Sequence, residues 1–311
     1  MVLAGVRYEY NDVRYDAFEV FRVGTDVRGT PISGGNEYGF LMPHLHMKYS
    51  LDNYTAFRFS VLMNYARPNF ADIVPFVNYD SDAVTLRLGN PDLAPARAWN
   101  FDLMFEKYFA NVGILSVGAY FKDIDKFQFS RIDPSLATDF PGYPGTAGFI
   151  FRQEQNGEKA RVMGVEVNAV RSLDFLPGFF KYLNADFNYT FAYSDAFTND
   201  RTGISLPGQA PHTFNASLAL DYRGFSARIM GNYNGTFASS LASSAQDDIY
   251  QEHRFHVDVN ASYNINKRWR VFGEWVNITN APSIRYQGER QRISRISYYG
   301  WWTRVGLGFR L

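Results

Sequence analysis

Polar and apolar residues alternate most clearly in the stretch Phe255-His256-Val257-Asp258-Val259-Asn260-Ala261-Ser262-Tyr263-Asn264-Ile265. Its odd-numbered positions carry apolar side chains, and its even-numbered positions carry polar ones. Successive side chains of a β-strand point to opposite faces, so this period of two predicts a strand. One face of that strand is expected to be apolar and the other polar.

The same alternation recurs along most of the chain, for example from Leu41 and from Leu183. With some lapses, it can be followed at about 2–10, 38–51, 54–66, 97–109, 112–125, 159–172, 181–195, 210–222, 225–236, 253–265, 268–280 and 299–311. A tilted strand needs about 9–11 residues to cross a bilayer, whereas strands of soluble proteins typically have about 5–6. The predicted fold class is therefore all-β, a transmembrane antiparallel up-and-down β-barrel with about twelve strands in this chain.

Short and long connections alternate between these segments. The short ones are Asp52-Asn53, Ala110-Asn111, Arg223-Gly224, Asn266-Lys267 and the slightly longer 174–180. The long ones are rich in Gly, Pro and Asp and lie at about 11–37, 67–96, 126–158, 196–209, 237–252 and 281–298. Short turns on one side and long loops on the other are typical of outer-membrane barrels. Such a sheet must close on itself, because hydrocarbon offers its backbone no hydrogen-bond partner.

Composition supports strands rather than membrane helices. Hydrophobic residues make up 46% of the chain, yet no run approaches the roughly 20 consecutive apolar residues of a membrane-spanning helix. The 31 Lys and Arg residues balance the 31 Asp and Glu residues, so no nucleic-acid partner is expected. Cysteine is absent, which excludes thiolate zinc sites, thiol catalysis and disulfides.

Several motifs carry a resemblance to a known family. They are Gly89-Asn90-Pro91-Asp92-Leu93-Ala94-Pro95 with Trp99-Asn100-Phe101-Asp102-Leu103, then 113–125 (GILSVGAYFKDID), Gly164-Val165-Glu166, and Trp275-Val276-Asn277-Ile278-Thr279-Asn280. In this order they resemble segments of TonB-dependent outer-membrane receptors. Ala96 stands where that family usually has an acidic residue.

The C-terminal segment adds to this resemblance. Trp301, Thr303, Val305, Leu307 and Phe309 alternate with smaller or charged residues, as in the terminal strand that the barrel-assembly machinery recognises. The chain departs from the pattern by ending on Leu311, where Phe is usual.

The resemblance implies a receptor barrel of about 22 strands, set in the lipid of the bacterial outer membrane, with a plug domain in its lumen. It implies energy-coupled uptake of a scarce nutrient such as a siderophore, cobalamin or glycan, through contact with the TonB complex. Residues 1–311 would then be a C-terminal part of the barrel, with the plug encoded upstream. The even strand number places both ends of this part on the periplasmic side. Neither enzymatic activity nor a cofactor is expected.

Five aromatic residues of the long loops are the candidate ligand contacts: Phe76, Tyr79, Phe140, Tyr143 and Tyr286. Binding residues concentrate in loops, and aromatic rings offer stacking faces to a small-molecule ligand. The competing interpretation is that these rings pack loop against loop.

Two alternatives to a transport receptor remain open. One is a self-contained outer-membrane pore of about twelve strands. The other is an outer-membrane hydrolase, although no Ser or carboxylate forms a catalytic motif with the scattered histidines. His44 and His46 lie two apart on the expected polar face, but a metal site needs three or more ligands, so no metal is predicted.

Overall fold

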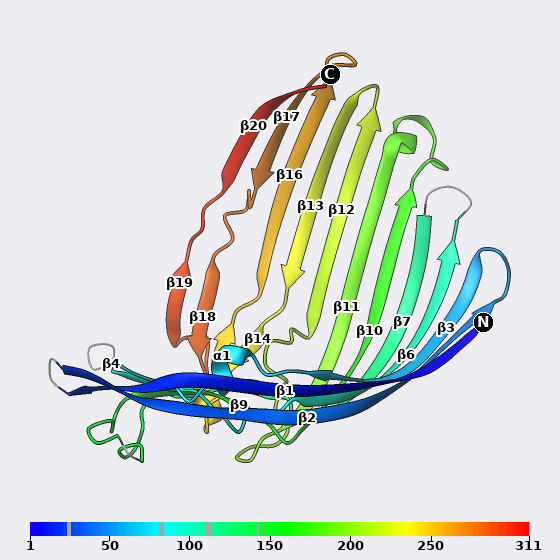
Figure 1. Cartoon of the computed structure of the whole chain (residues 1–311). Coiled ribbons are helices and arrows are strands. Elements are labelled where there is room, and N and C mark those ends of the chain that lie inside the picture. The colour runs from blue at the N-terminus through cyan, green and yellow to red at the C-terminus, as the bar shows by residue number, and fades with distance from the viewer. Residues whose placement is uncertain (24–25, 81–83, 110–112, 142, 311) are drawn as a thin grey trace.

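The computed structural model describes residues 1–23, 26–80, 84–109, 113–141 and 143–310 (Figure 1). Its main feature is a 12-stranded sheet in which each strand pairs antiparallel with the strand of the same sheet that follows it in the sequence. The strands of this main sheet are, in spatial order, β1 (Val2–Val23), β2 (Asp26–Ser50), β3 (Thr55–Ala66), β6 (Ala96–Tyr108), β7 (Gly113–Asp125), β10 (Lys159–Ser172), β11 (Leu183–Phe197), β12 (His212–Tyr222), β13 (Phe225–Asn234), β16 (Arg254–Asn264), β17 (Trp269–Val276) and β20 (Trp302–Phe309). Each corresponds to one of the segments predicted from alternation, so the predicted fold class is confirmed.

Strand pairing keeps the two kinds of side chain on separate faces. Between β3 and β6, Phe59 pairs with Leu103 on the apolar face. The next pair, Ser60 and Asp102, lies on the polar face, where the Ser60 hydroxyl donates to the Asp102 carboxylate over 2.9 Å. A shift of one residue would exchange the faces of a whole strand, so this register is strongly specified.

The apolar face is exposed rather than buried. Leu103 keeps 54% of its surface exposed, Ile229 49% and Val305 75%. Soluble proteins rarely expose contiguous apolar patches of more than a few hundred Å². A sheet with this much apolar surface on its outside needs an apolar medium around it.

The main sheet forms a strongly curved wall that does not close (Figure 1). Among the described residues, β1 and β20 each have one neighbour, β2 and β17, and are the two edges of the sheet. Lipid would leave such edges without hydrogen-bond partners, so in a membrane both need further strands.

Short turns and both chain ends lie along one edge of the wall (Figure 1). The Met1 amino group donates to the Lys48 carbonyl over 2.9 Å, beside the β2–β3 turn. Arg223 and Gly224 form a two-residue turn with φ of 47° and 83°, the geometry that matches the twist of a tight hairpin. The predicted turn at Ala110-Asn111 lies outside the described residues.

The predicted loop at 11–37 is wrong. β1 and β2 continue as one ladder from the Val2–Met47 pair to the Val23–Asp26 pair. The glycines of this segment, such as Gly34, suggested a loop, but an added Cβ at Gly34 would collide with the ring of Tyr15 on the opposite strand, as one at Gly39 would with the ring of Tyr8. These glycines make room for the two cross-strand tyrosines, and the strands therefore extend well beyond the length needed to span a bilayer.

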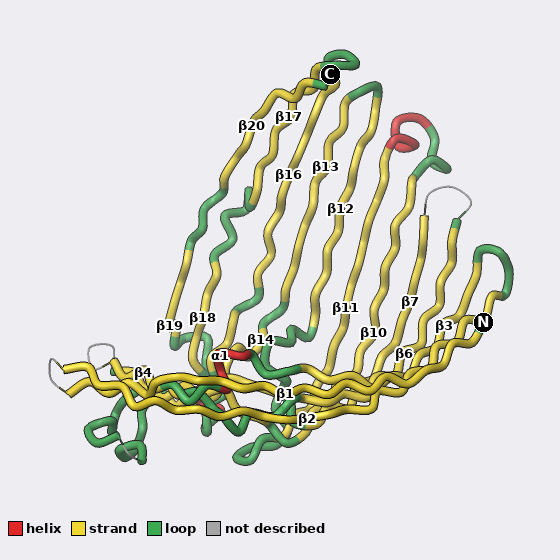
Figure 2. The backbone as a smooth tube through the Cα atoms, in the orientation of Figure 1, coloured by secondary structure: helices red, strands yellow, loops and turns green. Residues whose placement is uncertain are grey.

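The long connections at 67–96, 126–158, 237–252 and 281–298 contain strands that the alternation did not predict (Figure 2). They form two four-stranded accessory sheets. The first consists of β4 (Val77–Asp80), β5 (Thr85–Leu88), β9 (Ile150–Asn156) and β8 (Gln128–Asp133), and the second of β14 (Phe237–Ser240), β15 (Ile249–Gln251), β18 (Ser283–Gln287) and β19 (Ile293–Ser297). Short helical turns are α1 (Phe70–Ile73), η1 (Gly178–Tyr182) and η2 (Ala245–Asp247). Within the described ranges, no helix combines the length and the apolar character required to cross a membrane.

Candidate functional site

The two accessory sheets join into one structure at the long-loop end of the wall, which we call the loop cap (the described residues of 67–96, 126–158, 198–211, 235–253 and 277–301). Its junction lies between β8 and the residue after β14. Ile132 donates its N–H to the Leu241 carbonyl over 2.8 Å, and Leu241 donates to the Ser130 carbonyl over 3.1 Å. Backbone hydrogen bonds therefore hold loops from distant parts of the sequence together.

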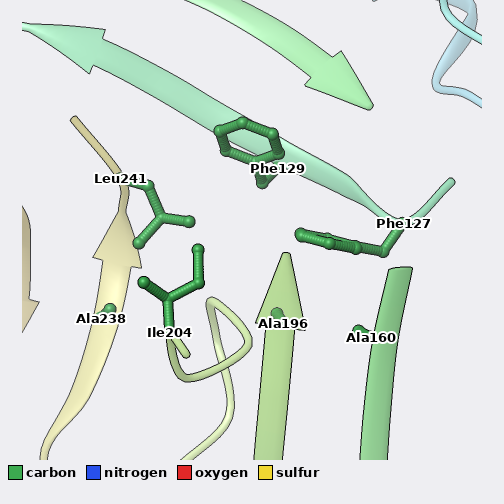
Figure 3. Packing of buried hydrophobic residues seen from close by; sticks show 7 residues of the cluster. All are labelled: Phe127, Phe129, Ala160, Ala196, Ile204, Ala238 and Leu241. Atoms are coloured by element: carbon green, nitrogen blue, oxygen red, sulfur yellow. The ribbon is translucent and has the colours of Figure 1, made fainter. Parts of the chain in front are cut away.

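A hydrophobic cluster fixes the loop cap to the main sheet (Figure 3). Its buried members are Phe127, Phe129, Ala160, Ala196, Ile204, Ala238 and Leu241. The Phe127 and Phe129 rings lie 5.7 Å apart, at the start of β8. Ala160 and Ala196, at the loop ends of β10 and β11, are completely buried. The cap is therefore a packed body with its own core rather than a set of separate loops.

The first accessory sheet contains or adjoins four of the five predicted ligand contacts. Tyr79 stacks on Phe149 with ring centroids 5.2 Å apart, and Phe140 stacks on Phe151 at 5.1 Å. The Tyr143 ring lies 6.1 Å from that of Phe140. These rings pack on one another around the buried core of β5 and β9.

Phe76, beside the first accessory sheet, and Tyr286 also have protein partners. Phe76 lies under the Arg87 guanidinium, 5.4 Å from it. Tyr286, in the second accessory sheet, stacks on Tyr250 at 5.4 Å, and burial raises the pKa of both phenols. The five residues thus fall into two groups, and whether any of them touches a ligand stays a prediction.

One buried ion pair ties two loops of the cap together. Arg201 donates to both carboxylate oxygens of Asp248, over 2.7 and 3.0 Å, and this contact raises the pKa of Arg201. Asp248 is only 1% exposed and also accepts the Ala242 N–H over 2.8 Å. Sequence reasoning missed this pair because its two members lie on different loops and share no motif.

Further ion pairs link the remaining loops. Arg131 contacts Asp133 at 3.2 Å and Asp200 at 2.7 Å. Arg290 contacts Glu252, whose side chain is only 6% exposed. The Arg131–Asp200 contact links the loop after β7 to the loop after β11, and the Arg290–Glu252 contact links the loops after β13 and β17. Side chains as well as backbone groups therefore hold the cap together.

Hydrogen bonds connect the Gly89 to Pro95 motif, which leads into β6, to the first accessory sheet. The Asn156 side chain accepts the Ala94 N–H over 2.7 Å and donates to the carbonyls of Ala94 and Lys126 over 2.9 and 2.8 Å. The Asn90 side chain donates to the Glu154 carbonyl over 2.9 Å. The two prolines of the motif have no N–H to donate in a β-ladder. Hydrogen bonds from side-chain amides hold this segment in place instead.

The polar face below the cap carries a row of amides, four asparagine side chains that lie beside a histidine. Asn168, Asn188, Asn215, Asn232 and His256 lie side by side on five neighbouring strands. Asn215 donates to Asn188 over 2.8 Å, and Asn232 donates to Asn215. A depression of about 390 Å³ lies beside this row. Such a face suits water or a polar protein surface, not lipid.

The two predicted polar-face histidines lie together on β2. His44 and His46 have ring centroids 5.7 Å apart. In the described part of the chain, no three His, Cys, Asp or Glu residues are placed to hold a metal ion together.

Comparison with known proteins gives one family and a set of solved structures. The profile of the family described as "TonB dependent receptor-like, beta-barrel" matches residues 1–278. No curated protein matches this sequence.

Three of the similar structures are transport receptors. The ferric-catecholate import receptor Fiu of E. coli K12 has 13% identity and a TM-score of 0.66, over 99% of this chain and 42% of the receptor. The copper transporter OprC has 13% identity and a TM-score of 0.70, over 99% and 45%. The ferric yersiniabactin uptake receptor FyuA of Yersinia pestis has 16% identity and a TM-score of 0.63, over 98% and 42%. At these identities the likeness shows the fold, and this chain spans less than half the length of each structure.

Proposed function

Because the chain belongs to the family of TonB-dependent receptor-like β-barrels, we propose that it is part of the barrel wall of an outer-membrane receptor for energy-coupled nutrient uptake. Receptors of this family are outer-membrane proteins, and the family and its structural neighbours are transport receptors rather than enzymes. The observation that carries the proposal is the register of the main sheet, which keeps exposed apolar side chains on one face of all twelve strands.

The two faces have different partners in this proposal. The apolar face, with residues such as Leu103 and Ile229, contacts membrane lipid. The polar face, with its row of amides, lines the lumen and contacts a plug domain. Strands absent from this chain pair with β1 and β20, because both edges need hydrogen-bond partners in lipid.

The ligand of the proposed receptor is a small molecule that carries a scarce metal, such as a ferric siderophore. Support comes from the names of the similar structures, which describe import of ferric catecholate, ferric yersiniabactin and copper. The loop cap, with Tyr79, Phe140, Tyr143, Phe76 and Tyr286, is the proposed capture surface. Cobalamin and glycans are the other ligand classes to test.

The remaining partners follow from the same proposal. Movement of ligand through the lumen is driven by the TonB complex acting on the plug. The β20 strand is the segment that the barrel-assembly machinery recognises during insertion. Both interactions are proposals for the whole receptor, of which this chain is one part.

The experiment is uptake by cells that lack other outer-membrane receptors and produce this chain together with its upstream coding sequence. A panel of ferric siderophores, cobalamin and oligosaccharides is supplied in labelled form, in strains with and without TonB. We expect accumulation of one ligand class, lost without TonB. Uptake that persists without TonB would favour a passive pore, and ester or peptide turnover by the purified protein would favour a hydrolase.

A further inference from the structure

The end of the wall opposite the loop cap carries a group of cations packed on aromatic rings. Arg171 of β10 has its guanidinium carbon 4.2 Å from the Phe109 ring centroid and 4.4 Å from that of Phe175. The guanidinium therefore lies between two phenyl rings. Its flat faces are covered, while its N–H groups point outward from its edge.

Two more cations contact rings in the same turn and in the β12–β13 turn. Arg223 lies 5.2 Å from the Tyr222 ring, and Lys181 lies 5.1 Å from the Tyr182 ring. Tyr182 and Tyr222 contact each other at 4.7 Å. The turn after β10 therefore contacts the β12–β13 turn, and we call the cations and rings of the two turns the turn-end cluster (Phe109, Arg171, Phe175, Lys181, Tyr222 and Arg223).

The turn-end cluster lies on the apolar face of the sheet. Arg171 has the same parity as Val165 and Val167 in β10, which are on that face. Tyr222 pairs with Phe225, in the apolar row that contains Leu218. A cation at the end of an apolar row lies where hydrocarbon gives way to lipid headgroups.

The three cations of the cluster all contact aromatic rings. One carboxylate, Asp174, belongs to the same turn, so the two turns together carry three positive charges and one negative charge. Asp221 lies on the polar face, where it accepts the Ser226 hydroxyl over 2.7 Å. At the loop end, by contrast, Arg131, Arg201 and Arg290 all form ion pairs.

The turn itself is built to lie in a membrane interface. Phe175, Phe179 and Phe180 are between 53% and 58% exposed. Aromatic rings and the stems of Lys and Arg are favoured at the depth of lipid headgroups. Exposed rings around a net positive charge therefore suit a surface that is apolar on one side and anionic on the other.

We infer that the turn-end cluster binds the phosphate of an anionic phospholipid in the leaflet that surrounds the short turns. Arg171, held between its two rings, donates to the phosphate oxygens, and Lys181 and Arg223 supply the second and third charges. The exposed phenylalanines contact the glycerol and upper acyl region. The inference rests on the proposed membrane location, but it does not depend on which nutrient is carried.

The test uses the whole receptor purified in detergent with equimolar phosphatidylglycerol and phosphatidylcholine, and counts the lipids that stay bound by native mass spectrometry. The parent protein is expected to retain phosphatidylglycerol in preference. Each cation near an anionic surface is worth about fivefold in binding. The Arg171→Gln, Lys181→Gln, Arg223→Gln triple variant should therefore lose most of that preference.

A matched control removes three cations of the loop cap, through Lys126→Gln, Arg152→Gln and Arg295→Gln. It should keep the preference of the parent, since these residues lie at the other end of the wall. Equal phosphatidylglycerol retention by the turn-end triple variant and the parent would overturn the inference, as would an equal loss in the control. A parent protein that binds both lipids equally would overturn it as well.

Two further variants keep the test decisive if the triple variant does not fold. Arg171→Gln alone should lower phosphatidylglycerol retention several-fold, whereas Arg171→Lys should retain more of it. Folding is checked by heat-modifiable mobility on gels, which reports the closed barrel. Failure of the parent to insert into vesicles would contradict the proposed function, while insertion without headgroup preference would contradict only this inference.

Discussion

At the scale of single residues, one asparagine side chain holds the Gly89 to Pro95 motif in place. Asn156 bonds both backbone groups of Ala94 and the carbonyl of Lys126. The motif itself was recognised in the sequence, but Asn156 was not, because it lies in a loop about sixty residues further along the chain. The conformation of the motif therefore depends on Asn156, which no local sequence pattern identifies.

Replacing Asn156 should remove the hydrogen bonds that hold the motif. Asn156→Ala leaves one donor and two acceptors without their partner, which is expected to lower the free energy of unfolding by about 1–3 kcal/mol. The measurement is the urea midpoint of the folded receptor, followed by its mobility on gels. Asn199→Ala is the control, because the Asn199 side chain is exposed and makes no hydrogen bond in the described structure. Equal midpoints for the two variants would contradict the assignment.

Glu154 should make the first accessory sheet sensitive to pH. Burial raises the pKa of this carboxyl above its ordinary value of 4.5. An acid whose folded-state pKa is raised favours the folded protein while it is protonated, and this contribution is lost as the pH rises through the folded-state pKa. Glu154→Gln should therefore gain stability relative to the parent as the pH rises from below to above that pKa. Unfolding midpoints of both proteins across this range provide the check, and a constant difference would count against it.

An aromatic residue at a strand end takes its face from its register in the strand. Trp269 and Tyr222 pair with Phe309 and Phe225 on the apolar face, where the interfacial rings of a barrel are expected. Tyr108 also ends a strand, but it shares the polar face with Glu106, to which its hydroxyl donates over 3.0 Å. Proximity to a strand end therefore does not decide which face a ring joins.

At the scale of elements, the twelve long strands could be predicted because alternation over ten or more residues is a local signal. The eight short strands of the loop cap could not. Strands such as β15, with 3 residues, are too short to display a period, and their partners lie in other loops. The candidate aromatics were likewise correctly placed in the long loops, but the rings they stack on were not predictable.

The Arg201–Asp248 pair should control the rigidity of the loop cap. Asp248→Ala leaves a half-buried guanidinium and the Ala242 N–H without an acceptor, and loss of one partner of a buried pair costs about 3–5 kcal/mol. We expect faster hydrogen exchange in residues 196–209 and 237–252, with little change in the main sheet. Mass spectrometry of peptides after exchange measures both regions.

The control for this variant is Asp200→Ala. Asp200 also pairs with an arginine, Arg131, but its side chain is 45% exposed, so the pair should contribute less than about 1 kcal/mol. Exchange in the cap should therefore stay close to that of the parent. Similar acceleration in the two variants would mean that the buried pair does not hold the loops.

At the scale of the whole molecule, the wall reverses the usual distribution of side chains. Its apolar residues face outward, its polar residues share the other face, and its hydrophobic clusters lie in the loop cap. The two ends also differ, since cations are paired in the cap and rest on aromatic rings at the turns. Both differences are expected of a membrane-spanning wall. Lipid on one side and the lumen on the other account for the two faces, and the cell exterior and the inner leaflet account for the two ends.

Two adjacent residues near the middle of β13 test this arrangement directly. Ile229 lies on the apolar face, and Met230 lies on the polar face opposite Asp258. Arginine on the lipid face near the bilayer centre costs about 2–4 kcal/mol, whereas arginine in a polar lumen is tolerated. Ile229→Arg should therefore lower the folded fraction of the receptor in phosphatidylcholine vesicles, while Met230→Arg should fold as the parent does. Because the two sites are neighbours of similar size and receive the same charge, an equal loss in both variants would mean that β13 does not divide lipid from lumen.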